Sequence, residues 1–278
     1  MSYKTILVHC DASPKLVHRV GIAAEMAQRF GAHLVGAYVQ APFDLPAFFD
    51  GAIPTDDLYA SYEAAAKADH DTASAAFNKA VKGMHLSTEW RLTKGYPENE
   101  LAVQARYADL VVLGQTEPES GLATPSDLPE SVALSTGRPT LVVPHIGAST
   151  KPGKSVMLCW NASRESARAA SDALPFLVAA ESVMVLVIDG RVSAEGHGAE
   201  PGADVAAWLA RHGVKATVQR DVSPDTDVGG VILSRAADHD IDLIVMGLYG
   251  HSRLREMVLG GASRTLLSSM TAPVFMSH

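Results

Sequence analysis

The sequence is poor in cysteine, in aromatic residues and in charge, and each shortage excludes a class of protein. Two cysteines in 278 residues, Cys10 and Cys159, cannot build the disulfide framework of a small secreted domain or a closed structural zinc site. Aromatic residues make up 6% of the chain and charged residues 19%, against 47% hydrophobic residues, a balance that disordered chains lack. The composition indicates compact globular domains, in which we expect both cysteines to be buried free thiols.

A basic surplus and long apolar runs are also missing. The formal net charge is −8, whereas a general nucleic-acid binder needs an excess of Lys and Arg to neutralise phosphates. No segment approaches the roughly 18 apolar residues of a membrane-spanning helix. Met1–Lys4 leads directly into a strand-like run, without the pattern of a secretory signal. We therefore expect a cytoplasmic protein that binds neither nucleic acid nor membranes.

The chain contains the same unit twice, which fits its length, because single domains usually have roughly 100 to 150 residues. Each half begins with a strand that runs into a polar turn, and each later has an apolar strand ending in glycine and a final strand after a proline. The matching segments are Thr5–Ser13 and Val156–Ser163, then Ala108–Gly114 and Ile241–Gly247, then Gly137–Pro144 and Thr271–Met276. This order of matches predicts two tandem domains.

Each half is expected to be a doubly wound α/β domain with a parallel sheet of about five strands. The strands are short, nearly continuous apolar runs, as in sheets that helices cover on both faces. Helical spacing of apolar residues predicts helices from Lys15 to Phe30 and from Arg164 to Ala179, followed by strands at His33–Val39 and Ser182–Ile188. Ligands of such domains bind at the carboxyl ends of the strands, here between the first and fourth strands.

We place the two domains at residues 1–147 and 154–278, joined by the turn-rich stretch His145–Lys154. The first domain also carries an insertion, Gln40–Thr55, with three prolines and several aromatic residues. This insertion is either a loop packed over the sheet or a lid or partner-binding surface.

The most informative segment follows the fourth strand of the second half. Gly247 and Gly250 leave no Cβ to block a phosphate from backbone amides, and Gly260 and Gly261 introduce a predicted helix, Ala262–Met270. The amides at a helix N-terminus favour an anion. Positive or potentially positive side chains surround this loop in an otherwise acidic protein, namely His251, Arg253, Arg255 and Arg264. Arg253 and Arg255 are the preferred charged contacts; the alternative is a solvated helix face paired with Glu256.

In these features the chain resembles the universal stress protein family, and specifically its tandem two-domain members. The ATP-binding pattern of that family is G-x2-G-x9-G-[S/T], and Gly247, Gly250 and Gly260 match its glycine spacing. The resemblance covers essentially the whole chain and implies a Rossmann-like fold of the adenine nucleotide alpha-hydrolase type. It further implies a stress-related protein with ATP, ADP or AMP as ligand, bound with or without Mg²⁺.

The resemblance also implies where adenosine lies. In the family it meets the turn after the first strand, which here is Asn161, Ala162 and Ser163, and the end of the second strand, near Val187 and Ile188. Asn161 stands where many members have Asp, but an amide can still donate and accept hydrogen bonds. Gly261 stands where the pattern has Ser or Thr, so a hydroxyl contact to phosphate is lost unless Ser263 supplies it. The expected phosphate neighbours are therefore Gly247, Gly250, His251, Arg253, Arg255, Gly260, Gly261, Ala262 and Ser263.

The first half has lost the glycine loop. Glu117 stands where the second half has Gly250, and paired glycines do not open the next helix. We therefore expect the N-terminal domain to bind nucleotide poorly or not at all. Asp11 and Ser13 keep the polar turn, so its adenosine end could still hold a small molecule; equally, the two residues could simply cap the following helix.

Three functions follow, of which the first is preferred: nucleotide occupancy biases a conformation or assembly, with at most slow hydrolysis. The second is an ATPase, for which Asp189, His251 and Glu256 are the candidates, although they form no recognised catalytic arrangement. The third is an interaction scaffold whose final strands, Leu141–Pro144 and Val274–His278, pair across a domain or subunit interface. Pairing within one chain would make it resemble a dimer of single-domain relatives, and a homodimer is also possible in principle.

Overall fold

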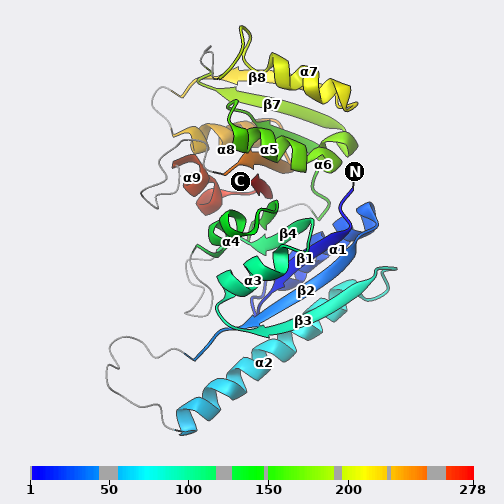
Figure 1. Cartoon of the computed structure of the whole chain (residues 1–278), viewed down its shortest axis with the longest axis vertical. Coiled ribbons are helices and arrows are strands. Elements are labelled where there is room, and N and C mark those ends of the chain that lie inside the picture. Colours follow the sequence, from blue (N-terminus) through cyan, green and yellow to red (C-terminus); the bar gives the residue numbers. More distant parts are fainter. Residues whose placement is uncertain are drawn as a thin grey trace.

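The computed structural model describes residues 2–43, 56–116, 127–146, 150–190, 196–223, 227–248 and 261–278. Strands and helices alternate along the whole chain, so the protein belongs to the α/β class (Figure 1). Among the described residues, no helix is both long enough and apolar enough to cross a membrane.

The first half contains five strands and four described helices. The strands are β1 (Thr5–Cys10), β2 (His33–Gln40), β3 (Thr88–Lys94), β4 (Leu110–Gly114) and β5 (Thr140–Val143). The helices are α1 (Leu16–Phe30), α2 (Asp56–Val81), α3 (Pro97–Ala105) and α4 (Leu128–Thr136).

The second half repeats this arrangement. Its strands are β6 (Ser155–Cys159), β7 (Ser182–Ile188), β8 (Ala216–Asp221), β9 (Leu243–Gly247) and β10 (Val274–Ser277). The described helices are α5 (Arg164–Asp172), α6 (Leu174–Ala179), α7 (Ala203–Arg211), α8 (Val228–Asp238) and α9 (Gly261–Ser269).

All the strands belong to one ten-stranded sheet in the order β3-β2-β1-β4-β5-β10-β9-β6-β7-β8. Each half therefore has the doubly wound order expected from the sequence, with its first and fourth strands adjacent. Neighbouring strands are parallel except β5 and β10, which pair antiparallel through Leu141 and Phe275 and their neighbours. The final strands thus join the halves within one chain, with β3 and β8 at opposite ends of the molecule (Figure 1).

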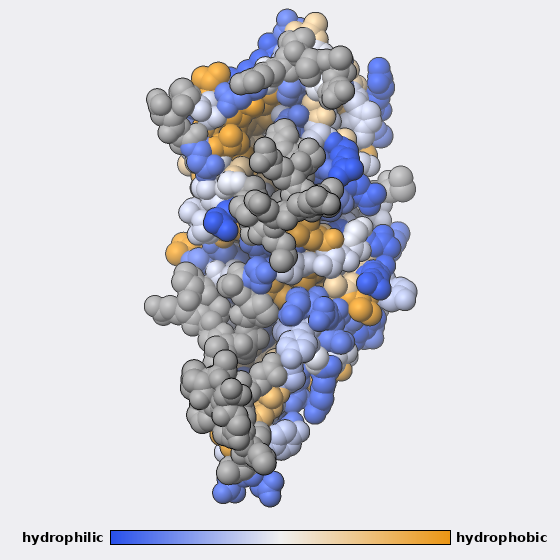
Figure 2. Space-filling model, turned by 60° about the vertical axis from the view of Figure 1, so that its left-hand side comes forward, coloured by the Kyte–Doolittle hydropathy of each residue, from blue (hydrophilic) through white to orange (hydrophobic). Residues whose placement is uncertain are grey.

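The strands are apolar on both sides because helices cover both faces of the sheet. On one face, a single cluster of buried residues combines α1 and α2 of the first half with α5, α6 and α7 of the second. On the other face, α3 and α4 cover the first half, and one cluster combines α4 with α8 and α9. The hydrophobic core therefore continues across the junction between the halves. On the side seen in Figure 2, the surface shows small hydrophobic patches separated by hydrophilic residues.

The long helix expected from Arg164 to Ala179 is two helices. α5 ends at Asp172 and α6 begins at Leu174, with Ala173 between them. Pro175 stands in the first turn of α6, where a proline is tolerated because its missing N–H would have no helical partner there. Helical periodicity predicted one helix because the apolar pattern continues across this proline.

Both cysteines are free thiols, and neither is activated. Cys10 is buried and Cys159 is half-buried. Burial raises the pKa of each thiol to about 12, so neither forms a thiolate at neutral pH.

An aromatic cluster reinforces the strand junction between the halves. Phe30 of α1 and Phe176 of α6 meet edge to face with ring centroids 5.1 Å apart. Tyr3 packs on both rings and donates a hydrogen bond to the Asp172 carbonyl at 2.7 Å. Phe275 of β10 completes the cluster, 6.0 Å from Phe176. Residues from both halves thus share one buried contact.

We expect Phe176→Ala to lower the free energy of unfolding by about 3–5 kcal/mol, because the ring is fully buried and leaves a cavity at the junction. Urea unfolding followed by circular dichroism measures this change. Val178→Ala is the matched control, since Val178 lies in the same helix and is 55% exposed; its effect should stay within about 0.5 kcal/mol. Equal losses in the two variants would contradict the role of the cluster.

Candidate functional site

The carboxyl ends of β6 and β9 form the topological switch point of the second half. These two strands are neighbours, paired through Met157 and Ile244. The chain leaves β6 for α5 on one face of the sheet, whereas α9, the next described helix after β9, lies on the other face. A crevice between diverging connections is where doubly wound folds bind ligands. This edge of the second half is therefore the candidate site.

Gly247 ends β9 directly under the first turn of α5. A Cβ at this position would lie 2.5 Å from the carbonyl carbon of Glu165 and 2.6 Å from the backbone nitrogen of Ser166, so no side chain fits. Gly247 is not one of the described residues with positive φ. The close packing of α5 on β9 therefore requires glycine at this position. The sequence analysis had explained the same glycine by the access of a phosphate to backbone amides.

The turn after β6 is held by its own polar groups. Ser163 caps α5, its hydroxyl accepting a hydrogen bond from the Ser166 amide at 3.1 Å. The Asn161 side-chain oxygen accepts from the Ser163 amide at 3.2 Å. Ala162 has a φ of 59°, an unusual conformation for a residue with a side chain. Asn161 is exposed, so the side chain expected to meet adenosine stands at the surface of the turn.

The expected adenosine neighbours on β7 lie on opposite faces of the sheet. Val187 is buried in the cluster of α5, α6 and α7, whereas Ile188 packs against the cluster of α8 and α9. Val187 also lines a hollow of about 420 Å³ at the carboxyl ends of β7 and β8, together with Pro201 and Arg220. This volume falls in the range of small-molecule pockets, about 300–1,000 Å³.

Carboxylates at this hollow already have partners. Asp189 has a φ of 52° and accepts a hydrogen bond from the Ser223 amide at 3.1 Å. Asp221 pairs with Arg235 through two contacts of 2.6 and 3.1 Å, and that guanidinium lowers the pKa of the Asp221 carboxyl. Among the residues that the structure describes, no group of three or more His, Cys, Asp or Glu could hold a metal ion.

The central part of the glycine loop lies outside the described residues. Five expected phosphate neighbours belong to it, namely Gly250, His251, Arg253, Arg255 and Gly260, as do the candidate catalytic residues His251 and Glu256. Their roles stay predictions.

At the far side of this gap, the structure describes the start of α9. Gly261 is exposed at its first position and Ala262 is half-buried, whereas Ser263 is only 4% exposed. Among the described residues, a Cβ at Gly261 would meet Asp227 alone, at an ordinary contact distance of 3.5 Å. The described neighbours therefore leave room for a side chain at this position. The sequence analysis missed Asp227, whose carboxylate adds negative charge beside this helix N-terminus.

Arg19 fills the corresponding switch point of the first half. Its guanidinium donates to the His9 carbonyl at 2.9 Å and to the Asp11 carboxylate at 2.7 Å, and the side chain is 5% exposed. A Cβ at Gly114 would lie 2.1 Å from Arg19 Nη1, so the guanidinium rests on the end of β4.

The two halves differ at this position by one side chain. Arg19 lies six residues after Ser13, and Ala169 lies six residues after the matching Ser163. The sequence carried a signal for Arg19, because it interrupts the buried stripe of α1 formed by Leu16, Ala23 and Ala27. Asp11 and Ser13 hold the turn itself: Asp11 accepts from the Ser13 amide, and Ser13 accepts from the Lys15 amide. The expectation that they cap the following helix is not met, because the N-cap of α1, Lys15, has no side-chain cap hydrogen bond.

Burial and charge shift both ionisable neighbours of Arg19. Burial alone would raise the pKa of Asp11, but the guanidinium outweighs that effect and holds it below its ordinary value. Burial lowers the pKa of His9 to about 4, so the imidazole is neutral at pH 7.

We expect His9 to make the protein less stable as the pH falls below about 6.5. Below that pH the unfolded chain is protonated at His9, whereas the folded protein is not protonated there until the pH approaches its lowered pKa of about 4. Between pH 7.5 and pH 5 this group should cost about 2 kcal/mol. His9→Asn should remove that part of the pH dependence in urea unfolding, whereas His85→Asn, at an exposed position, should keep it. Parallel pH profiles for wild type and His9→Asn would contradict this account.

Comparison with known proteins agrees with the duplicated architecture. The model of the universal stress protein family matches residues 2–144 and again residues 154–278. A comparison with curated protein sequences gives no significant match.

Solved structures show the same fold over the whole chain. A universal stress protein from Archaeoglobus fulgidus DSM 4304 has a TM-score of 0.71 at 16% identity, covering 98% of this chain and 95% of its own. A candidate universal stress protein from Pseudomonas aeruginosa UCBPP-PA14 has a TM-score of 0.59 at 13% identity, covering 99% and 93%. A shorter universal stress protein, solved in complex with cAMP, covers 51% of this chain and 98% of its own at 25% identity, with a TM-score of 0.32. With two family matches that together span nearly its full length, the chain belongs to the universal stress protein family, as a tandem two-domain member.

Proposed function

We propose that this protein is a stress-related binder of ATP or a related adenine nucleotide, held mainly by its C-terminal domain, residues 154–278. The observation that carries this proposal is the difference between the two switch points. The buried guanidinium of Arg19 fills the switch point of the first half, whereas Ala169 stands at the matching position of the second half. Of the two halves, the second keeps the glycine spacing G-x2-G-x9-G in its sequence. Membership of the universal stress protein family supports the same choice of ligand.

In the proposed complex, adenosine lies at the carboxyl ends of β6 and β7. The exposed Asn161 offers its amide there, Ala162 and Ser163 supply backbone, and Val187 supplies apolar surface beside the hollow. The phosphates lie over residues 247–263, where backbone amides and the N-terminus of α9 attract an anion. Arg253 and Arg255 offset the negative charge of Asp227, which stands close to Gly261.

The N-terminal domain, residues 1–147, is proposed to keep the fold without this ligand. Arg19 rests against Gly114 and is held by two hydrogen bonds, so a nucleotide would have to displace a buried, paired guanidinium. Removing that partner from Asp11 is costly, because a largely buried carboxylate would lose its counter-charge. The asymmetry makes one nucleotide per chain the expected stoichiometry.

The nucleotide is proposed to act as a stabilising or regulatory ligand. A ligand that binds only the folded state stabilises it by mass action, by about 2.7 kcal/mol at a concentration 100 times the Kd. The site contacts α5 and α9, which pack against β9 and the continuous core. Occupancy would therefore stabilise the strand junction as well as the loop.

We expect ATP to bind at one site per chain, and we expect this binding to be lost in a Gly250→Val, Gly260→Val double variant. Branched side chains at these positions would cover the backbone amides that the phosphates need. Isothermal titration with ATP, ADP and AMP measures stoichiometry and affinity. Gly121→Val, in the matching loop of the first half, is the control and should bind ATP like wild type. Unchanged binding in the double variant, or two sites per chain, would overturn the assignment to the C-terminal domain.

We expect Gly261→Ser to tighten ATP binding about three- to tenfold. The substitution restores the hydroxyl of the family pattern, and a net hydrogen bond contributes about 0.5–1.5 kcal/mol. The described neighbours leave room for it, since among them a Cβ there meets Asp227 alone, at 3.5 Å. Gly261→Ala lacks the hydroxyl and should leave the Kd unchanged. If serine and alanine behave alike, no phosphate oxygen lies at this position.

A further inference from the structure

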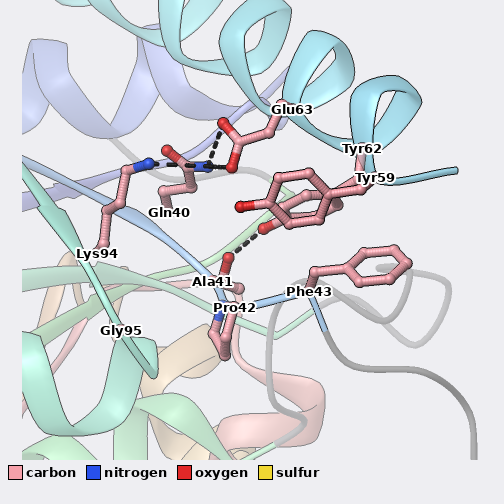
Figure 3. A pocket seen from close by; sticks show the side chains of 9 residues that line it. All are labelled: Gln40, Ala41, Pro42, Phe43, Tyr59, Tyr62, Glu63, Lys94 and Gly95. Carbon is pink, nitrogen blue, oxygen red and sulfur yellow. Dashed lines mark hydrogen bonds and ion pairs between the residues drawn. The ribbon is translucent and has the colours of Figure 1, made fainter. Parts of the chain in front are cut away.

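A second hollow lies in the first half, away from the switch point filled by Arg19. It has a volume of about 350 Å³ and is formed by the carboxyl ends of β2 and β3 and by the N-terminal turns of α2 (Figure 3). It is thus beside β2 and β3, whereas Arg19 rests on the ends of β1 and β4. A ligand could enter it without disturbing the buried guanidinium.

One side of this hollow is aromatic. Phe43, which follows β2, packs on two residues of α2: its ring centroid lies 5.1 Å from that of Tyr62 and 6.0 Å from that of Tyr59. The Tyr62 hydroxyl donates a hydrogen bond to the Ala41 carbonyl, which ties α2 to the end of β2 (Figure 3). Tyr59 is 52% exposed, so much of its ring surface is accessible. The arrangement offers ring surface to a flat, apolar partner.

The other side of the hollow is polar, and its two charged groups, Glu63 and Lys94, differ in how closely their partners approach. The Glu63 carboxylate accepts hydrogen bonds from the Gln40 amide, at 3.4 and 3.5 Å. The Lys94 ammonium also approaches Glu63, but only to 3.9 Å, and its side chain is 67% exposed. An ammonium has three donors, and a contact of this length at the surface contributes little. The Lys94 ammonium, rather than the hollow as a whole, therefore keeps the capacity to pair with a second acceptor of negative charge, on the side away from Glu63.

The matching hollow of the second half has a different lining. It lies at the ends of β7 and β8, which correspond to β2 and β3, so the fold itself creates a hollow at this place in each half. Its described lining contains Val187, Pro201 and Arg220, and none of its described lining residues is aromatic. Among the described lining residues, aromatic rings beside a lysine thus occur in the hollow of the first half and not in that of the second, which favours a separate ligand for the first half.

We propose that the hollow between β2, β3 and α2 binds a small planar aromatic carboxylate. The ring lies against Tyr59 and its aromatic neighbours, and the carboxylate pairs with the Lys94 ammonium at the rim. Apolar contacts hold the ring, and one charge-assisted contact fixes its orientation. Small-molecule sites commonly combine an apolar lining with a few orienting polar groups in this way. This ligand is independent of the nucleotide proposed for the second half.

The test uses indole-3-carboxylate as the probe and indole-3-carboxamide as its neutral counterpart. Titration of the full chain, followed by ligand-observed NMR, should show at least tenfold weaker binding of the amide. Lys94→Met should weaken the carboxylate at least tenfold, whereas Lys94→Arg should stay within about threefold of wild type. Lys67→Met is the matched control: Lys67 lies in α2, pairs with Asp71 and does not line the hollow. It should bind the probe like wild type.

Two further variants separate this site from the nucleotide site. Tyr59→Ala should weaken the probe at least fivefold while ATP binding stays unchanged, and Gly250→Val, Gly260→Val should do the reverse. The proposal is overturned if the carboxamide binds as well as the carboxylate, if Lys94→Met binds like wild type, or if no binding is detected at millimolar probe. Competition between ATP and the probe for one site would also overturn it.

Discussion

The antiparallel contact between β5 and β10 is the interaction on which the rest of the structure depends. Each half ends in a strand of four residues, and either strand alone would leave a buried, apolar edge without hydrogen-bond partners. Pairing them turns two five-stranded sheets into one and lets the core continue on both faces. The aromatic cluster around Phe176 then closes the junction beside the strands. A tandem chain therefore reaches in one molecule the arrangement that two separate copies would have to form by association.

Once the halves are fixed together, they are free to differ at their ligand-binding edges. A strand, a polar turn and a helix follow one another at both switch points, and this arrangement accommodates Arg19 in one half and Ala169 in the other. Arg19 satisfies its donors on the His9 carbonyl and Asp11, so the first half is stable without a bound anion. Under the proposed function, this difference on a helix face is what separates the binding of the two domains, while the fold of both stays the same.

Much of the fold could be predicted from the sequence because buried parallel strands have a distinctive apolar pattern and the duplication repeats it. The α/β class and the neighbouring first and fourth strands of each half follow from that pattern, whereas the family was indicated by the glycine spacing after the fourth strand of the second half. The break at Pro175 was missed because the apolar spacing continues through it. The positions of Asp227 and of the guanidinium on Gly114 depend on contacts between segments distant in the sequence, which periodicity does not report. At Gly247 the sequence identified the residue but gave only part of the reason, because the packing of α5 on β9 requires glycine there whether or not a ligand binds.

The duplication also explains why a second kind of site can arise in the same chain. Parallel strands of a doubly wound sheet end at one edge, so every connection at that edge is a possible lining. At the ends of β2 and β3 the connection brings Phe43 and α2 together, whereas at the ends of β7 and β8 the same place holds Pro201 and Arg220. The switch point of the first half lies between β1 and β4, and this hollow lies between β2 and β3. If both proposals hold, a half whose switch point is filled by Arg19 keeps a binding role through the neighbouring hollow.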